Sequence, residues 1–276
     1  MNLEKHDGIG TLVSIVSPTY NQGRYIERAI QSVTNQTYSN WELIIVDGES
    51  TDETHAVLKR YEKQTRQVIA KGNEAEASNH GFRLSRGEII GWLSTDDYYE
   101  SDAFEFAVDY FLKHPDVAMI YGDYRRVDSS GRELKVCNLP DFDLGNLLHR
   151  GGSYIVTPAL FFRRAVIDEI GYLDETLKYS CDYDYWIRLG SKFCIRHVPK
   201  ILANYRVHPQ ALTAQGLRVG DMIKEAALVR KRYLSDPSLA DILAIRFYDF
   251  LHIAYVLRER GRALVGKSHR LTESQS

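Results

Sequence analysis

The chain has 276 residues, of which 44% are hydrophobic and 26% charged, so it can bury a full core and is not an intrinsically disordered protein. Its formal net charge of −2 argues against nucleic acid as a partner, although the segment from residue 218 onward is basic, with 11 Lys and Arg against 7 Asp and Glu. Cys137, Cys181 and Cys194 have no CxxC spacing, which argues against a disulfide framework or a zinc site and favours a cytoplasmic location.

Apolar, β-branched runs alternate with amphipathic stretches in the first third of the chain. Leu12 to Val16 predicts a buried strand that stops at Pro18, and Ile26, Ala29, Ile30 and Val33 share one face of the helix that follows. The same alternation predicts strands at 41–47, 67–70 and 88–93, and helices at 51–61 and 75–84. Such alternation predicts βαβ units and an α/β fold with a parallel sheet that is covered on both faces.

The pattern changes after residue 115. Residues 117–136 predict a hairpin around a Ser-Ser-Gly turn, and antiparallel strands are therefore expected in the sheet. Further strands are predicted at 157–162 and 193–205, with a helix at 181–189 between them. From Gly220 the chain reads as helical, with an apolar stripe formed by Leu239, Ile242, Leu243, Phe247, Phe250, Leu251 and Ala254.

Three predicted strand ends carry polar residues: Pro18 to Asn21, Asp47 to Ser50 and Ser94 to Asp97. Open α/β sheets bind ligands beyond the carboxyl ends of their strands, so we expect these segments to meet at one site. Asp96 and Asp97 are adjacent like charges that need water, a hydrogen-bond donor or a cation. Taken alone, such a pair is more often a solvated loop or helix cap than a site for Mg²⁺ or Mn²⁺.

Four stretches together resemble the family 2 inverting glycosyltransferases of the GT-A fold, of the bacterial polysaccharide or cell-surface glycan type. They are SIVSPTYNQGRYIERAIQSVTNQTYSNWELIIVDGESTDET, ASNHGFRLSRGEIIGWLSTDDYY, GYLDETLKYSCDYDYWIRL and YRVH, and they cover about residues 11 to 210 in order. The resemblance implies a catalytic domain at 1–215, with a donor-binding half at 1–115 and an acceptor half at 116–215. Residues 216–276 would form a C-terminal helical extension.

The resemblance also implies the reaction, which is hexosyl transfer from a nucleotide-diphosphate sugar to a hydroxyl of a saccharide or lipid-linked saccharide. A divalent Mn²⁺ or Mg²⁺ ion is implied as cofactor, and the ThrAspAsp at 95–97 matches the family's DxD-type motif. Asp182 is the implied catalytic base, and Asp97 and His208 are the implied metal ligands. The implied donor-binding residues are Pro18, Tyr20, Asn21, Asp47, Asn79 and Asp96.

Several alternatives stay open in the sequence. Asp184 competes with Asp182 for the role of base, because residues two apart on a helix cannot both point into one cleft. Cys181 stands where many relatives have Glu, and Ala75 and His80 also depart from the usual pattern. The missing Gly-rich loop after the first strand argues against a nucleotidyltransferase or dehydrogenase. A catalytically silent carbohydrate-binding or scaffold protein is the remaining alternative.

The tail admits three interpretations: packing on the catalytic body, a homodimer contact, or peripheral contact with the inner membrane face. Basic residues accompany its apolar stripe, and many relatives act on lipid-linked acceptors. The N-terminus lacks the pattern of a signal peptide, and no apolar run approaches the roughly 18 residues of a spanning helix. Cytoplasmic localisation is therefore expected. The basic residues are Arg230, Lys231, Arg232, Arg258, Arg260 and Arg262.

Overall fold

The strands and helices predicted for the first ninety residues are confirmed. The computed structural model of the chain describes residues 10–150 and 153–234. In it β1 pairs in parallel with β2 and β4, and β2 pairs in parallel with β3. The elements of this part are β1 (Val13–Thr19), α1 (Gly23–Thr34), β2 (Trp41–Asp47), α2 (Thr54–Arg60), β3 (Arg66–Ile69), α3 (Glu74–Leu84) and β4 (Ile89–Trp92).

Pro18 does not end the first strand, contrary to the prediction, because β1 continues to Thr19. β4 pairs with β1 only from Val13 to Val16, whereas β2 stays paired through Thr19. A proline lacks an N–H group and is tolerated where a strand has one free side. The longer strand carries Thr19 and Tyr20 beyond the end of β4.

Antiparallel strands complete the sheet, as predicted for the region after residue 115. β8 lies antiparallel between β4 and β6, β7 forms a hairpin with β6, and β9 runs parallel to β6. The strand order is β3-β2-β1-β4-β8-β6-β9-β5, with β7 beside β6. The elements are β5 (Tyr98–Tyr99), α4 (Ala103–Lys113), β6 (Val117–Val127), β7 (Glu133–Cys137), α5 (Leu144–Arg150), a 3₁₀ turn (Thr157–Ala159), β8 (Leu160–Arg163), α6 (Ala165–Ile170), α7 (Cys181–Gly190), β9 (Cys194–Arg206), α8 (Leu212–Val219) and α9 (Asp221–Tyr233).

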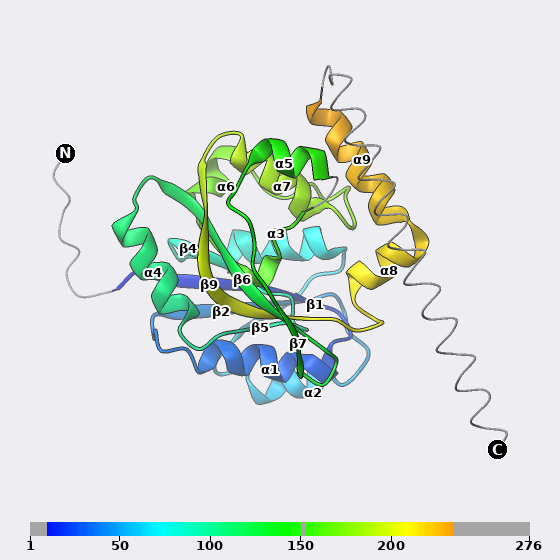
Figure 1. Ribbon diagram of the computed structural model, residues 1–276. Coiled ribbons are helices and arrows are strands. Elements are labelled where there is room, and N and C mark those ends of the chain that lie inside the picture. Colours follow the sequence, from blue (N-terminus) through cyan, green and yellow to red (C-terminus); the bar gives the residue numbers. More distant parts are fainter. Residues whose placement is uncertain (1–9, 151–152, 235–276) are drawn as a thin grey trace.

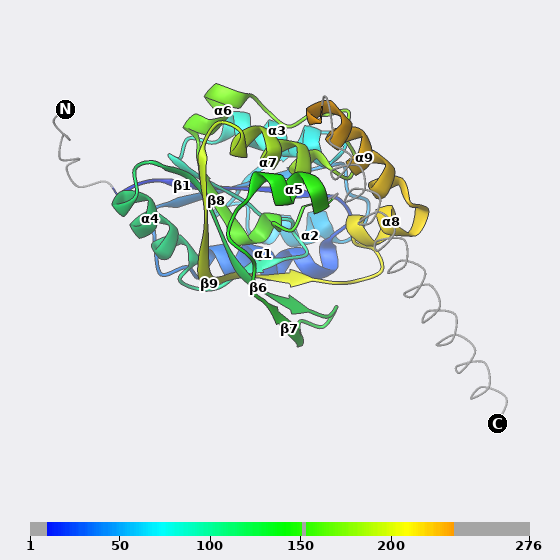
Figure 2. The same ribbon diagram turned by 45° about the horizontal axis from the view of Figure 1, so that its top comes forward.

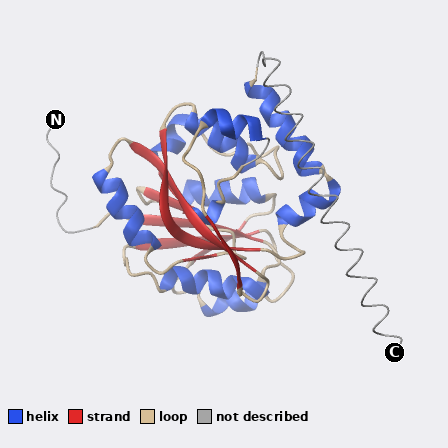
Figure 3. Cartoon of the chain, viewed as in Figure 1, coloured by secondary structure: helices blue, strands red, loops and turns tan. Residues whose placement is uncertain are grey.

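Helices cover both faces of the curved sheet (Figures 1 and 3). One hydrophobic cluster joins the sheet to α1, α2 and α4, and includes Ile30, Leu58 and Phe104. The other joins the sheet to α3, α6 and α7, and includes Phe82 and Trp186. Burial on both faces explains why β1 and β2 read as continuous apolar runs instead of alternating ones. The hairpin of β6 and β7 projects from the sheet (Figure 2).

A capping box holds the start of α3, and a close contact with β1 holds the helix farther along. The Asn73 side chain accepts from the N–H of Glu76 at 3.0 Å, and the Glu76 carboxylate accepts from the N–H of Asn73 at 2.6 Å. Farther along the helix, a Cβ at Gly81 would collide with the side chain of Val16. These contacts place Glu74, in the first turn of α3, at the carboxyl edge of the parallel strands.

Helix α9, which belongs to the predicted C-terminal extension, packs on the preceding part of the chain. α9 contributes Ala226 and Val229 to the second hydrophobic cluster, and Arg230 is only 2% exposed. Arg232 donates to Asp174 at 2.6 Å. Packing on the body, one of the three alternatives, therefore holds for α9. The predicted stripe at 239–254 and residues Arg258, Arg260 and Arg262 lie outside the described residues.

The predicted boundary between residues 215 and 216 falls within α8, so the division of the chain stays a prediction. Within residues 10–150 and 153–234, no helix has both the length and the hydropathy needed to cross a bilayer.

Candidate active site

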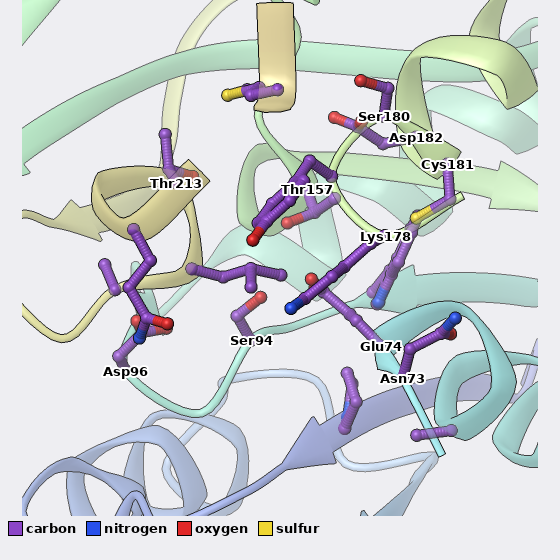
Figure 4. Close-up of a pocket in the computed structure, with 18 of the residues that line it drawn as sticks. Asn73, Glu74, Ser94, Asp96, Thr157, Lys178, Ser180, Cys181, Asp182 and Thr213 are labelled. Atoms are coloured by element: carbon purple, nitrogen blue, oxygen red, sulfur yellow. The ribbon is translucent and has the colours of Figure 1, made fainter. Parts of the chain in front are cut away.

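A cavity of about 570 Å³ lies at the carboxyl edge of the parallel strands. The end of β1 and the segments that follow β1, β2 and β4 line one side of it, including Pro18, Tyr20, Gly48 and residues 94–97. The start of α3, Ser153, residues 155–157, residues 178–183 and the helices α8 and α9 supply the other walls (Figure 4). The three strand ends that the sequence analysis expected to converge do meet here.

Two of the predicted donor-binding residues at the first strand end lie on the cavity and one does not. Pro18 and Tyr20 line it, and Tyr20 is 60% exposed. Asn21 adopts a positive φ of 52° and is not on the lining. Its backbone N–H donates to Ser50 Oγ at 2.8 Å, and its side-chain oxygen accepts from the N–H of Thr51 at 2.8 Å. Asn21 therefore ties the loops after β1 and β2 together.

Asp47 lies behind the cavity lining, next to Gly48, and is 2% exposed. Its Oδ1 accepts from the N–H and the hydroxyl of Ser50, at 3.0 and 2.6 Å. Its Oδ2 is buried and accepts no hydrogen bond from any described residue, with His55 Nδ1 at 3.5 Å. Buried carboxylate oxygens normally have a donor, so Asp47 Oδ2 is an unsatisfied acceptor close behind the cavity wall at Gly48.

Asp96 and Asp97 both line the cavity. Asp97 is buried and its Oδ1 accepts from the backbone N–H of Arg206 at 2.7 Å. Burial, followed by the charge of Asp96, raises the pKa of Asp97 well above its ordinary value. The site therefore concentrates negative charge that a cation would relieve.

His208, predicted as a metal ligand, is buried and does not line the cavity. Its Nε2 lies 2.9 Å from Asp96 Oδ2, and its ring packs on Tyr25 with the centroids 4.6 Å apart. In this arrangement His208 contacts Asp96 on the side away from the cavity.

Asp182, and not its rival Asp184, faces the cavity. Asp182 lies in the first turn of α7, and its Oδ1 accepts from the N–H of Tyr183 at 2.7 Å. Burial raises the pKa of Asp182 from 3.8 to about 6. Asp184 is buried elsewhere: it accepts from Arg188 Nε at 2.8 Å and from the Tyr233 hydroxyl at 2.7 Å. Geometry thus decides which of the two carboxylates faces the cavity, and the role of base stays a prediction.

Glu74 and Lys178 are cavity residues that the sequence analysis does not identify. Burial, and then the charges of Asp182 and Asp96, raise the pKa of Glu74 from 4.5 to about 7, while a hydrogen bond with Ser94 lowers it. Lys178 is the only Lys or Arg on the lining within the described residues, and it points toward Glu74 and Ser94 (Figure 4). The one feature of the sequence that could have indicated Glu74 as a site residue is its position shortly after β3, at the same edge of the sheet.

Asn79, predicted to bind the donor, is 1% exposed and lies outside the cavity lining. Its Nδ2 donates to Leu173 O at 3.0 Å and to Glu175 Oε1 at 2.9 Å, while its Oδ1 accepts from the N–H of Leu173 at 2.9 Å. Both amide hydrogens are therefore used within the protein. In this structure Asn79 joins α3 to the segment that leads into α7.

Replacing Asn79 by alanine should lower the free energy of unfolding by at least about 2 kcal/mol, because the buried backbone groups of Leu173 lose their partner. Chemical denaturation of the full chain measures this. Arg83→Ala is the matched control, since it removes a half-exposed partner of the same Glu175 and should cost less than about 1 kcal/mol. Loss of nucleotide affinity at unchanged stability would instead support donor binding by Asn79.

The acidic pair has the donor chemistry for a divalent cation, although no group of three or more His, Cys, Asp and Glu able to hold a metal occurs in the described ranges. Mg²⁺ is commonly held by one or two carboxylates together with substrate phosphates. Asp97 Oδ2 receives no hydrogen bond from the described residues, and Asp96 lies beside it on the cavity. The residues present therefore fit an ion whose remaining ligands come from a substrate.

Comparison with known proteins decides the family. The model of Glycosyl transferase family 2 matches residues 14–171, which is more than half of the chain. The chain is a family 2 glycosyltransferase. The matched region of this glycosyltransferase runs from β1 through α6, so it contains Asp47, Asp96 and Asp97 and ends before Asp182.

Curated relatives of the glycosyltransferase extend farther along it. An uncharacterized glycosyltransferase of Rickettsia typhi is 30% identical over 226 residues, which are 77% of this chain and 69% of that protein. The chondroitin synthase of Escherichia coli is 30% identical over 213 residues, or 75% of this chain. The match spans only 31% of the synthase, whose other regions have no counterpart in the alignment.

Solved structures agree with the fold. TarS 1–349 of S. aureus in complex with UDP-GlcNAc has a TM-score of 0.63 at 17% identity, covering 86% of this chain and 71% of that one. The mannosyltransferase PcManGT of Pyrobaculum calidifontis, in complex with GDP-Man and Mn²⁺, also has a TM-score of 0.63, at 16% identity, covering 95% and 80%. With the family match, these similarities confirm the α/β GT-A fold predicted from the sequence.

Proposed function

We propose that this glycosyltransferase moves a hexosyl group from a nucleotide-diphosphate sugar to a hydroxyl of a saccharide or lipid-linked saccharide, with inversion at the anomeric carbon. The observation that carries the proposal is that Asp182 faces the same cavity as Asp96 and Asp97, although they come from distant parts of the chain. The product would belong to a surface polysaccharide or glycolipid. Similarity to the chondroitin synthase supports a saccharide acceptor.

The donor nucleotide would lie along the ends of β1, β2 and β4. Tyr20 offers an exposed ring on which a base can stack, and Asp47 Oδ2 can accept a base N–H. Pro18 borders the same wall, and Asp96 would contact the ribose. The UDP-GlcNAc and GDP-Man complexes of the two structural neighbours support a nucleotide-sugar donor.

Asp97 would hold Mn²⁺ or Mg²⁺ at the diphosphate, and the Mn²⁺ complex of PcManGT supports this choice. When bound, such an ion neutralises charge on the departing diphosphate. His208 Nε2 contacts Asp96 and would become a direct ligand only by giving up that contact. While it keeps that contact, His208 would hold Asp96 in position beside Asp97.

Asp182 would act on the acceptor. Its carboxylate takes the proton of the acceptor hydroxyl while that oxygen bonds to the anomeric carbon, and the bond from this carbon to the diphosphate oxygen breaks with its electron pair. A pKa of about 6 makes Asp182 a stronger base than an ordinary aspartate and still leaves it ionised at neutral pH. Direct displacement requires no protein nucleophile and inverts the configuration.

Calorimetric titration of UDP, GDP, dTDP and CDP, each with and without Mn²⁺, tests the donor site. One nucleotide should bind more tightly than the others and should require the metal. The diphosphate sugars of that base are then supplied with saccharide acceptors, and the anomeric configuration of the product is read by NMR.

Failure of all four nucleotides to bind, with or without metal, would contradict the donor site and favour the carbohydrate-binding or scaffold alternative. Retention of configuration in the product would contradict direct displacement, even if the nucleotide binds as expected.

A further inference from the structure

Glu225, in the second turn of α9, is bound by three successive backbone N–H groups. The N–H of Lys178 donates to its Oε1 at 2.8 Å, and those of Tyr179 and Ser180 donate to its Oε2 at 2.6 and 2.7 Å. Consecutive N–H groups that converge in this way form an anion-binding nest, and hydrogen bonds to an ionised acceptor are the stronger kind. A carboxylate from the C-terminal extension therefore fixes the backbone just before α7.

The nest directly precedes the proposed base. Ser180 is the residue before α7, and Asp182 lies in the first turn of that helix. Lys178, Tyr179 and Ser180 also line the cavity themselves. α9 adds a second attachment to α7, because the Tyr233 hydroxyl donates to Asp184 at 2.7 Å. The position of Asp182 against a substrate thus depends on α9.

Glu225 also acts on Asp182 through its charge. Burial is the main cause of the raised pKa of Asp182, and the negative charge of Glu225 raises it further, whereas the backbone N–H groups of Tyr183 and Asp182 lower it. The other charged groups on this cavity, among the described residues, are Glu74 on α3, Asp96 and Asp97 after β4, and Lys178 in the loop before α7. Glu225 differs from these in that it also holds the backbone in place.

We infer that Glu225 is a positioning residue of the transfer reaction, which orients and tunes Asp182 from the C-terminal extension. The inference rests on the proposed function in taking Asp182 as the base. It assigns a catalytic contribution to α9, which lies beyond the region matched by the family model.

NMR titration of the Asp182 carboxyl carbon in the full-length protein tests the electrostatic part without any substrate. In Glu225→Gln the apparent pKa of Asp182 should fall below that of the wild type, because a negative charge has been removed. Glu225→Asp keeps the charge and should stay closer to the wild type. Asp221→Asn is the matched control, since it removes an exposed carboxylate from the same helix whose ion-pair partner among the described residues is Lys224, and should change nothing.

Steady-state kinetics test whether Glu225 positions Asp182. The donor is the diphosphate sugar of the nucleotide that binds in the calorimetric panel. Glu225→Gln has one acceptor oxygen for three N–H groups, so kcat should fall at least about tenfold at unchanged donor KM. The acidic limb of its pH profile should move to lower pH. Wild-type values of kcat, pH profile and Asp182 pKa in a folded Glu225→Gln protein would overturn the inference, as would a loss of stability alone.

The two proposals fail separately. If no donor supports transfer, the proposed function fails, while the NMR titration still shows whether Glu225 controls Asp182. If transfer occurs and Asp182→Asn abolishes it, but Glu225→Gln behaves as the wild type, only the inference about Glu225 fails.

Discussion

Asp182→Asn should lower kcat by about 10²–10⁴-fold while nucleotide affinity stays within about twofold of the wild type. The amide cannot take the proton of the acceptor hydroxyl, yet it still can accept the N–H of Tyr183 at the start of α7. Steady-state kinetics and calorimetric titration on the same preparation measure both quantities. In the wild type, kcat/KM should rise with pH to a plateau above about pH 6, because the base acts in its ionised form.

The same variant should not lose stability at pH 7.5. The pKa of Asp182 is about 6 in the folded protein and 3.8 ordinarily, so above pH 6 the folded state holds a carboxylate that the unfolded chain accommodates better. Protonated Asp182 therefore stabilises the folded state at low pH, and this stabilisation is lost as the pH rises from about 4 through 6. A neutral amide removes this penalty, and thermal unfolding should show an unchanged or higher Tm.

Asp184→Asn is the matched control, two residues along the same helix. Asp184 is buried, pairs with Arg188 and accepts from Tyr233, so its replacement should lower the free energy of unfolding by about 1–3 kcal/mol. The folded protein should keep its kcat, because this carboxylate does not reach the cavity. The opposite result, with Asp184→Asn inactive and Asp182→Asn active, would reverse the assignment of the base.

Asp97→Asn should abolish the metal dependence of nucleotide binding and weaken that binding by at least about 100-fold in the presence of Mn²⁺. Asparagine still accepts the N–H of Arg206 but lacks the charge that a divalent cation needs. Without metal the variant should be at least as stable as the wild type. The raised pKa of Asp97 means that the ionised carboxylate destabilises the metal-free folded protein, and a neutral amide removes this cost.

Asp102→Asn is the control for Asp97. Asp102 lies five residues along the chain, pairs with Lys200 at 2.8 Å and does not line the cavity, so nucleotide binding should keep its metal dependence. Unchanged Mn²⁺-dependent affinity in Asp97→Asn would show that the acids do not hold the ion. Metal would then have to act elsewhere or not at all.

The polar ends of the parallel strands could be predicted because they depend on local patterns. Short continuous apolar runs identify β1, β2 and β4, period-3.6 apolar patterns identify their helices, and parallel strands necessarily end at one edge. This geometry is sufficient to bring Tyr20, Asp47 and Asp97 to the same side of the sheet. The two-residue strand β5 could not be predicted in this way, because it exists only through pairing with Asn204 and Ala203 of β9.

Side-chain direction and partners depended on contacts between distant segments. Asn79 has a residue type suited to ligand binding, yet its hydrogen bonds go to Leu173 and Glu175. His208 approaches Asp96 only because β9 returns beside β5. Folding raises the pKa of Glu74 by burying it, and then by bringing the charges of Asp182 and Asp96 near it.

The amino-acid sequence by itself determined the α/β class, the edge of the sheet that carries the site and the family, because all three follow from local periodicity and motif order. Only the tertiary structure decided that Asp182 and not Asp184 faces the cavity, that Glu74 and Lys178 share it, and that Glu225 of α9 holds the loop before Asp182. The physical reason is that burial, pKa and hydrogen-bond partners are properties of neighbours in space, and these neighbours come from segments far apart in the chain.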